Sequence, residues 1–244
     1  TKEDPRYDQI MVIENQIKKK YDRSFFFGWE IKRKYGRREL DAASILNIKI
    51  KTTFGPAGEE CGTVYDETTT CKICGANRRQ VGPLKLKKGS IPKKDIARTI
   101  AGEIVVSEKF TNAFKKRKLK GAVFKPIFLG KGSFNYFQLA ALTEIDLSQS
   151  TVAGINPFDL STSSEGEIYK CPEGHTIGLN LLSEPHVLNS LSIQEYDFFA
   201  SKQLVGVKRG LLRPEPLYLC SQEFRLMVLE EKLKGFDFEI AHIE

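Results

Sequence analysis

Residues that commonly carry enzyme chemistry are scarce in this sequence. It has only three histidines, His175, His186 and His242, and none belongs to an H-E-x-x-H metal motif. No G-x-S-x-G nucleophile motif is present. The acidic residues are scattered, so spacing nominates no pair of carboxylates for acid–base catalysis. We therefore do not expect an enzyme, and a catalytic site without a recognisable motif is kept only as a third hypothesis.

Long apolar runs and an even number of cysteines are also missing. No run approaches the roughly 20 apolar residues of a membrane span, and no signal peptide is visible. The sequence has five cysteines, whereas a secreted disulfide framework favours an even count. We therefore expect reduced thiols, a cytoplasmic location and no membrane partner.

The composition does supply a core and a mild positive charge. Hydrophobic residues make up 41% of the 244 residues, which suits one large domain or two small ones. The formal net charge is +7, from 38 basic and 31 acidic residues. Such a small excess does not require a nucleic-acid partner.

Two short cysteine motifs stand out. They are Cys71-Lys72-Ile73-Cys74-Gly75 and Cys171-Pro172-Glu173-Gly174-His175. A C-x-x-C turn can direct two thiolates at one ion, and tetrahedral zinc needs two more ligands. We expect a closed, structural zinc site formed by Cys71, Cys74, Cys171 and His175. Two alternatives stay open: remnants that have lost the metal, or a redox pair in the first motif.

The two motifs belong to a pattern that repeats along the chain. Four blocks recur in the same order, with the spacing changing only between blocks. The first copy holds Gly62-Thr63-Val64-Tyr65, the first cysteine motif, Ser90-Ile91 with Asp95-Ile96, and Ser107 to Phe124. The second copy holds Gly166-Glu167-Ile168-Tyr169, the second motif, Ser192-Ile193 with Asp197-Phe198, and Ser221 to Phe238. This order predicts an internal duplication.

The last block predicts a strand, a helix and a strand in each copy. Ile104–Val106 and Leu217–Cys220 are short apolar runs that suit strands, which makes Cys220 a core residue. Ser107 and Ser221 are candidate N-caps, and Gly121 and Gly235 are candidate left-handed C-caps. Upstream, Ser192 with Glu195 predicts a capping box. The fold class expected is α+β, with two related halves, each a small sheet with short helices, joined around the paired cysteine motifs.

With these motifs in view, the chain resembles the double-CXXCG motif proteins of bacteria and related immunity proteins of polymorphic toxin systems. The resemblance rests on Cys71-x-x-Cys74-Gly75, the Cys171 motif, and the blocks 105–110 and 119–124. It covers about residues 58 to 243. It implies a protein that binds and neutralises a toxin. The chain departs from the family pattern at Gly174, where the second cysteine is missing, so a retained metal requires His175 as the substitute ligand.

We divide the chain into four parts: 1–57, an N-terminal extension packed on the core; 58–127, the first copy; 128–163, a connector; and 164–244, the second copy. In the extension, Phe25–Trp29 lies beside basic residues, which favours core strands with charged outer faces, or single-stranded nucleic-acid binding. The basic run Lys115–Lys118 suits a helix C-terminus or an acidic partner. The loop 202–216 is an ordinary insertion or a site of partner contacts.

Three functions follow as hypotheses. The first is an immunity protein, or antitoxin, that occludes a cognate protein toxin and carries a structural zinc ion. The alternative is a zinc-ribbon nucleic-acid-binding protein, suggested by the basic clusters and a pI near 9.0. The third is the unrecognised enzyme. We expect the toxin as partner and no small-molecule substrate, and the net positive charge suggests that the toxin's binding face is acidic.

Overall fold

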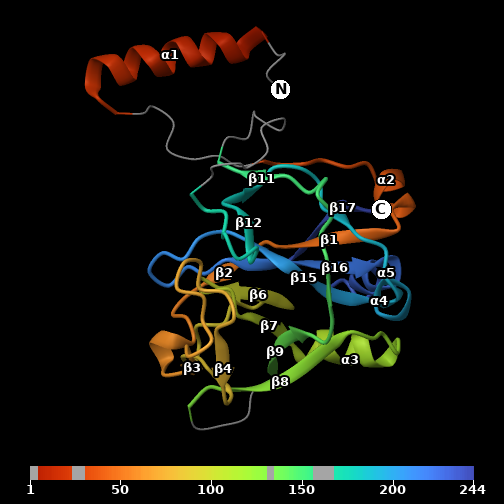
Figure 1. Cartoon of the computed structure of the whole chain (residues 1–244). Coiled ribbons are helices and arrows are strands. Elements are labelled where there is room, and N and C mark those ends of the chain that lie inside the picture. Colours follow the sequence, from red (N-terminus) through yellow and green to blue (C-terminus); the bar gives the residue numbers. More distant parts are fainter. Residues whose placement is uncertain (1–4, 24–30, 131–134, 156–167) are drawn as a thin grey trace.

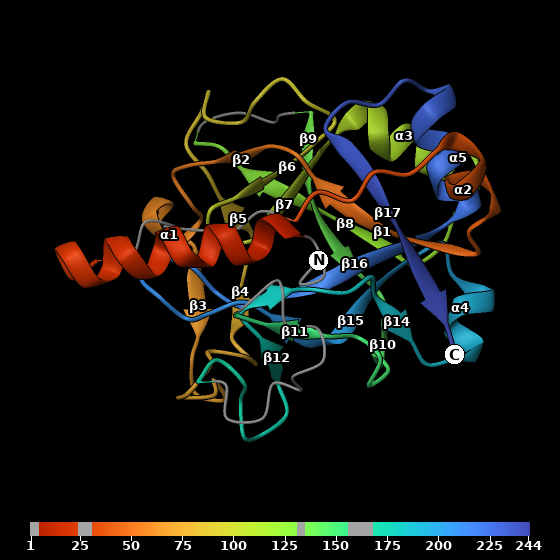
Figure 2. The same cartoon turned by 90° about the horizontal axis from the view of Figure 1, so that it is seen from above.

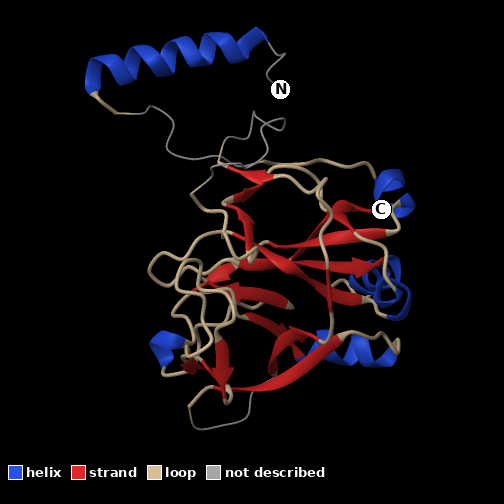
Figure 3. Cartoon of the chain, in the orientation of Figure 1, coloured by secondary structure: helices blue, strands red, loops and turns tan. Residues whose placement is uncertain are grey.

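The chain folds into an α+β structure dominated by sheet, with a few short helices (Figure 3). The computed structural model describes residues 5–23, 31–130, 135–155 and 168–244. The α-helices are α1 (Pro5–Tyr21), α2 (Arg37–Ala42), α3 (Glu108–Lys116), α4 (Leu191–Glu195) and α5 (Gln222–Glu230), and one 3-10 helix, η1, spans Glu59–Cys61. The predicted α+β class is confirmed.

Two large sheets make up most of the molecule. The first has the order β2-β6-β7-β9-β8-β5, with β2 (Thr53–Phe54), β6 (Ile96–Thr99), β7 (Ile104–Ser107), β9 (Tyr136–Ala141), β8 (Ala122–Phe128) and β5 (Leu84–Lys85). The second has the order β10-β15-β16-β1-β17-β14, with β12 also paired to β15. Its strands are β10 (Glu144–Ile145), β15 (Phe198–Val205), β16 (Glu215–Ser221), β1 (Ile45–Ile50), β17 (Phe236–Ile243), β14 (His186–Val187) and β12 (Thr176–Gly178).

The two sheets are alike in order, direction and register. Reading along both orders, the pairings run parallel, antiparallel, antiparallel, antiparallel and parallel. Ser107 ends β7 opposite Tyr136 of β9, and Ser221 ends β16 opposite Ile45 of β1. Each half also has a two-stranded antiparallel sheet: β3 (Val64–Asp66) with β4 (Arg79–Val81), and β11 (Ala153–Gly154) with β13 (Asn180–Leu181).

Strand β1 reaches the second sheet from the far end of the chain. It lies between β16 and β17 and pairs antiparallel with both (Figures 1 and 2). Its first four residues are buried, because a central strand is covered on both faces. The helix α1 has no buried residue and stands apart from the sheets (Figure 1). The predicted N-terminal extension thus contains both a central strand and an exposed helix.

Helices α3 and α5 begin in the same way. Ser107 and Ser221 accept hydrogen bonds from the amides of Phe110 and Phe224, both at 3.2 Å, as predicted. Each serine also donates to an aspartate, Ser107 to Asp95 and Ser221 to Asp197. The same aspartates accept backbone bonds from the opposite half. Asp95 is bonded by the Lys234 amide at 2.7 Å, and Asp197 by the Lys120 amide at 2.9 Å. The helix starts are therefore tied across the two halves.

The predicted role of two glycines needs correction. Helix α3 is closed by Arg117 and then Lys118 with φ 59°, and α5 by Glu231 and then Lys232 with φ 51°. Gly121 and Gly235 come later and lie against the opposite half. A Cβ on Gly121 would lie 2.1 Å from the Phe198 carbonyl oxygen, and one on Gly235 would lie 2.3 Å from that of Ile96. These glycines permit close backbone approach rather than capping the helices.

The main core lies where the two sheets and two helices meet. Phe110 and Phe224 are fully buried, with ring centroids 5.8 Å apart, and Phe236 stacks on Phe110 at 5.6 Å. The sheets wrap this core in a nearly closed, barrel-like arrangement, with β1 touching β6 and β9 touching β15. Cys220 is buried in this core, as predicted. One core therefore serves both halves.

Several local predictions also have outcomes. Helix α4 begins after Ser190 and contains Ser192, so the proposed capping box at Ser192 is wrong. The segment 202–216 is partly strand, because β15 runs to Val205 and β16 begins at Glu215. Phe25–Trp29 lies outside the described residues.

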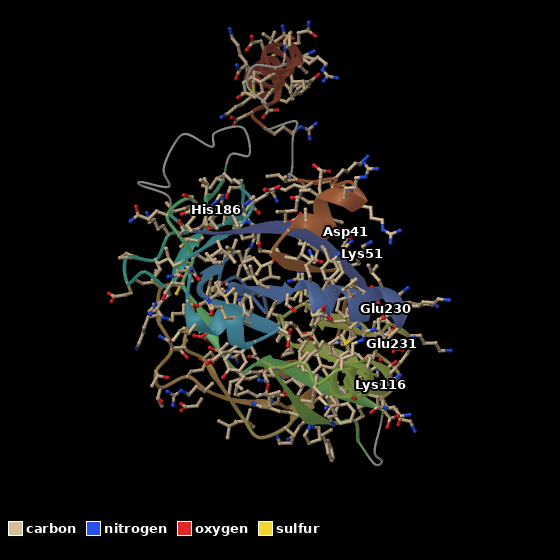
Figure 4. All side chains as sticks on the ribbon, turned by 90° about the vertical axis from the view of Figure 1, so that its right-hand side faces the viewer. Asp41, Lys51, Lys116, His186, Glu230 and Glu231 are labelled. Carbon is tan, nitrogen blue, oxygen red and sulfur yellow. The ribbon has the colours of Figure 1, made fainter. Side chains whose placement is uncertain are left out.

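The basic run at the end of α3 faces acidic residues of α5 (Figure 4). Arg117 pairs with Glu230, and Lys116 lies 4.0 Å from Glu231. Charges of opposite sign at two neighbouring helix ends attract each other, although exposed pairs of this kind contribute little. These two cations of the predicted run therefore have partners within the protein.

Candidate metal centre and adjoining cleft

The first cysteine motif is a tight turn. The amide of Gly75 donates to the Cys71 carbonyl at 2.8 Å, and the amide of Cys71 donates to the Ala76 carbonyl at 2.8 Å. Gly75 has φ 79°, a conformation that glycine adopts without cost. This turn directs the side chains of Cys71 and Cys74 to the same side.

The second motif also forms a tight turn, one residue shorter than the first, with a different final ligand. The amide of Gly174 donates to the Cys171 carbonyl at 2.9 Å, and Gly174 has φ 77°. The amide of Cys171 donates to both the carbonyl oxygen and the hydroxyl oxygen of Thr176. His175 follows the glycine and turns its ring toward the thiols.

The four predicted ligands meet in one place. Cys71 and Cys171 have their Sγ atoms 3.8 Å apart. His175 Nδ1 lies 3.7 Å from the Cys74 Sγ and 3.6 Å from the Cys171 Sγ. The four ligand atoms lie within 4.8 Å of one another. This cluster can hold a metal ion, and it joins segments 100 residues apart.

The three separations of 3.6 to 3.8 Å match the edges of a metal-centred tetrahedron. With metal–sulfur bonds of about 2.3 Å and metal–nitrogen bonds of about 2.0 Å, a tetrahedron has sulfur–sulfur edges of about 3.8 Å and sulfur–nitrogen edges of about 3.5 Å. Disulfide bonding would need sulfurs about 2.05 Å apart. The observed spacing therefore suits four ligands around one ion better than a disulfide.

The surroundings favour thiolates at the exposed side of the cluster. Backbone amides of Cys74 and Ile73 lower the pKa of Cys71 to about 6, whereas burial raises the pKa of Cys74 to about 12. A bound cation would favour the thiolate of both. The Asn77 side chain contacts His175 Nε2 at 3.3 Å, which holds the ring with Nδ1 toward the sulfurs.

Basic side chains lie next to the first motif. A Cβ on Gly75 would lie 3.1 Å from Lys208 and 3.6 Å from Arg213, both from the segment between β15 and β16. Arg78 and Arg213 share Glu59, at 2.8 Å and 3.7 Å. Three thiolates around a divalent ion carry one excess negative charge, and these cations are placed to offset it.

A cleft of about 410 Å³ adjoins the metal centre. Its walls come from both halves: Gly75 to Arg78 after the first motif, Gln138 to Ala141 of β9, and Ala200, Ser201 and Leu204 of β15. The Arg78 guanidinium lies over the Tyr65 ring at 3.9 Å from its centre. Sequence reasoning missed this cleft, because its residues come from many distant segments and share no motif.

The remaining histidines form a separate pair. His186 and His242 stack with ring centroids 4.6 Å apart. His186 bonds Glu244 at 2.8 Å and His242 bonds Glu184 at 2.5 Å. Among the described residues, they belong to no cluster of three or more metal-ligating side chains with converging ligand atoms. Cys61 ends η1 and does not belong to the four-residue cluster.

Comparison with known proteins yields no match to a protein-family model and no match to a curated protein. Within the described residues, no helix has both the length and the apolar character needed to cross a membrane. The proposed function therefore rests on the geometry of the site and on the fold.

Proposed function

We propose that this protein is a non-enzymatic binding protein, an immunity protein that neutralises a bacterial toxin by occluding it. The observation that carries the proposal is the convergence of Cys71, Cys74, Cys171 and His175. The paired cysteine motifs are the feature on which the resemblance to bacterial immunity proteins rests. Their convergence supports treating them as one functional unit, with His175 in place of the cysteine missing at position 174.

The proposed ion is zinc. Three thiolates and one imidazole at tetrahedral spacing are a donor set that zinc favours. Four protein ligands leave no open position for water, so the site would stabilise the fold rather than catalyse a reaction. Reduced, metal-ligating cysteines also support the proposed cytoplasmic location.

We further propose that the two halves arose by internal duplication, with a shifted boundary. When β1–β8 is matched with β9–β17, every strand of the first sheet has a counterpart in the second, because β1 then corresponds to β9, and β12 is the extra strand of the second sheet. In the first sheet, β9 follows β8 directly along the chain. In the second, the matching place beside β17 is filled by β1 from the N-terminal part. The first strand of each copy, β1 or β9, would then complete the sheet formed by the other copy.

A circular permutant tests this correspondence. This chain starts at Lys51 and carries residues 31–50 after Glu244, through a flexible linker. Strand β1 then follows β17 along the chain, as β9 follows β8 in the first sheet. We expect it to fold and to bind metal like the parent protein. A matched chain that lacks residues 31–50 should not fold. An unfolded permutant would contradict the shifted duplication.

The toxin proposal is tested by protection. The protein is expressed together with the toxin encoded beside it, and growth and complex formation are measured. We expect restored growth and a stable complex, and both should weaken in the Cys71→Ser, Cys74→Ser variant. Absence of both binding and protection by the folded, metal-loaded protein would contradict the proposal.

The alternative, a zinc-ribbon nucleic-acid-binding protein, is distinguished by salt. A protein that neutralises several phosphates loses affinity steeply as salt rises. Pairing of Lys116 and Arg117 with Glu231 and Glu230 leaves less free positive charge at the densest basic run. Tight single-stranded DNA binding with a steep salt dependence would favour the alternative over the toxin partner.

A further inference from the structure

The cleft beside the metal centre, here called the open cleft, has a counterpart in the other half. The counterpart, here called the paired cleft, has a volume of about 330 Å³. It is lined by Asn47–Ile50 of β1 and Glu215–Tyr218 of β16. The open cleft is lined by Gln138–Ala141 of β9 and Ala101–Ile104 at β7. These are the matching positions of the two sheets, so the two clefts occupy the same place in the two halves.

The two clefts differ in the side chains that fill them. Arg98 and Glu215 form an ion pair in the paired cleft. The matching residues of the open cleft are Ala200 and Ala101. Lys49 of the paired cleft is likewise matched by Ala140. Alanine at these three positions removes the charged side chains that occupy the paired cleft, which leaves the open cleft free for a ligand.

The charges at the open cleft favour a cationic ligand. Its basic residues Arg78 and Arg213 share Glu59, and Arg78 also pairs with Glu67 at 2.9 Å, so two carboxylates face these two guanidinium groups. Glu144, on the edge strand β10, lines the cleft and is exposed, and among the described residues it has no ion-pair or hydrogen-bond partner through its side chain. Tyr218 lines both clefts, and its pKa is raised by burial and by the charges of Glu215 and Glu144.

We propose that the open cleft binds a lysine or arginine side chain of the protein partner, with Glu144 as its counter-ion and Tyr218 beside it. The volume lies within the range of about 300–1,000 Å³ that ligand pockets occupy. Leu139 and Leu204 supply apolar surface for the aliphatic stem of such a side chain. This inference deepens the proposed binding function and rests on it for the identity of the partner as a protein.

The test is an NMR titration of the metal-loaded protein with N-acetyl-arginine amide, and with N-acetyl-glutamine amide as the neutral control. We expect saturable shifts of the Gly102, Gln138 and Tyr218 amides with the arginine compound only. Glu144→Gln should weaken this binding about tenfold. The double variant Ala101→Glu, Ala200→Arg should abolish it, because it builds the ion pair of the paired cleft into the open one.

Lys49→Ala is the matched control and should leave the titration unchanged, because that residue lines the paired cleft. Shifts that are equal for both compounds, or unaffected by Glu144→Gln, would overturn the proposal, as would shifts confined to other surfaces. Because no toxin is present, a negative titration counts against the cleft alone. Lost protection with an intact titration would count against the proposed function instead.

Discussion

Removing the metal ligands of the first cysteine motif should strongly destabilise the protein. The double variant Cys71→Ser, Cys74→Ser leaves only Cys171 and His175, too few to hold a structural ion. The lost ion would have linked segments 100 residues apart. On the chain-entropy estimate, a cross-link closing a loop of about 100 residues stabilises a fold by about 4.7 kcal/mol. In a protein of this size about 1 kcal/mol shifts the Tm by about 2–4 °C, so we expect the Tm to fall by about 10–20 °C.

The assay combines metal analysis of protein purified without added metal with thermal unfolding by circular dichroism. We expect one metal ion per chain in the parent protein and none in the variant. A strong chelator added to the parent protein should produce the same fall in Tm. Cys61→Ser is the control and should keep both the metal and the Tm, because Cys61 lies outside the cluster. Metal-free parent protein, or a double variant that melts within about 3 °C of the parent, would refute the cross-link.

Three further results are expected. Gly121→Ala should destabilise the fold far more than Gly82→Ala in urea unfolding, because both glycines have positive φ but only Gly121 lies against a backbone oxygen; equal losses would contradict the close-approach role. Ser221→Ala should cost about 1–2 kcal/mol through the lost cap, whereas Ser190→Ala should be neutral or stabilising, because the buried Ser190 hydroxyl has no partner among the described residues. The hydrogen bond from Lys202 lowers the pKa of Asp146. The ionised Asp146 therefore stabilises the fold at neutral pH, and this stabilisation is lost as the pH falls through the lowered pKa. The free energy of unfolding, measured against pH, should fall less steeply in acid for Asp146→Asn than for the parent protein.

Much of the local structure could be predicted from the sequence. Short apolar runs followed by serine predicted the strands β7 and β16 and the helices α3 and α5 that follow them, because an N-cap acts on amides only three residues away. The candidate metal ligands were also predictable, since a C-x-x-C turn and a second cysteine–histidine turn each form locally. Their meeting depended on the recurrence of the surrounding blocks.

The long-range arrangement could not be predicted in the same way. The sequence of β1 indicates a strand, but its place between β16 and β17 depends on partners near the other end of the chain. The spacing of Gly121 and Gly235 suggested helix caps, although their true constraint is a carbonyl oxygen of the opposite half. The open cleft escaped prediction for the same reason: the absence of charged side chains at positions 101 and 200 has meaning only beside the Arg98–Glu215 ion pair of the matching cleft.

The position of β1 has a consequence for synthesis in the cell. A ribosome makes β1 well before its two neighbours, β16 and β17. At about 5–20 residues per second, the roughly 190 residues between β1 and β17 take about 10–40 s to appear. Throughout that time Ile45, Leu46 and Ile48, all buried in the finished fold, have no sheet to join. The newborn chain therefore passes through a period in which its N-terminal strand depends on chaperones or on temporary contacts to avoid aggregation.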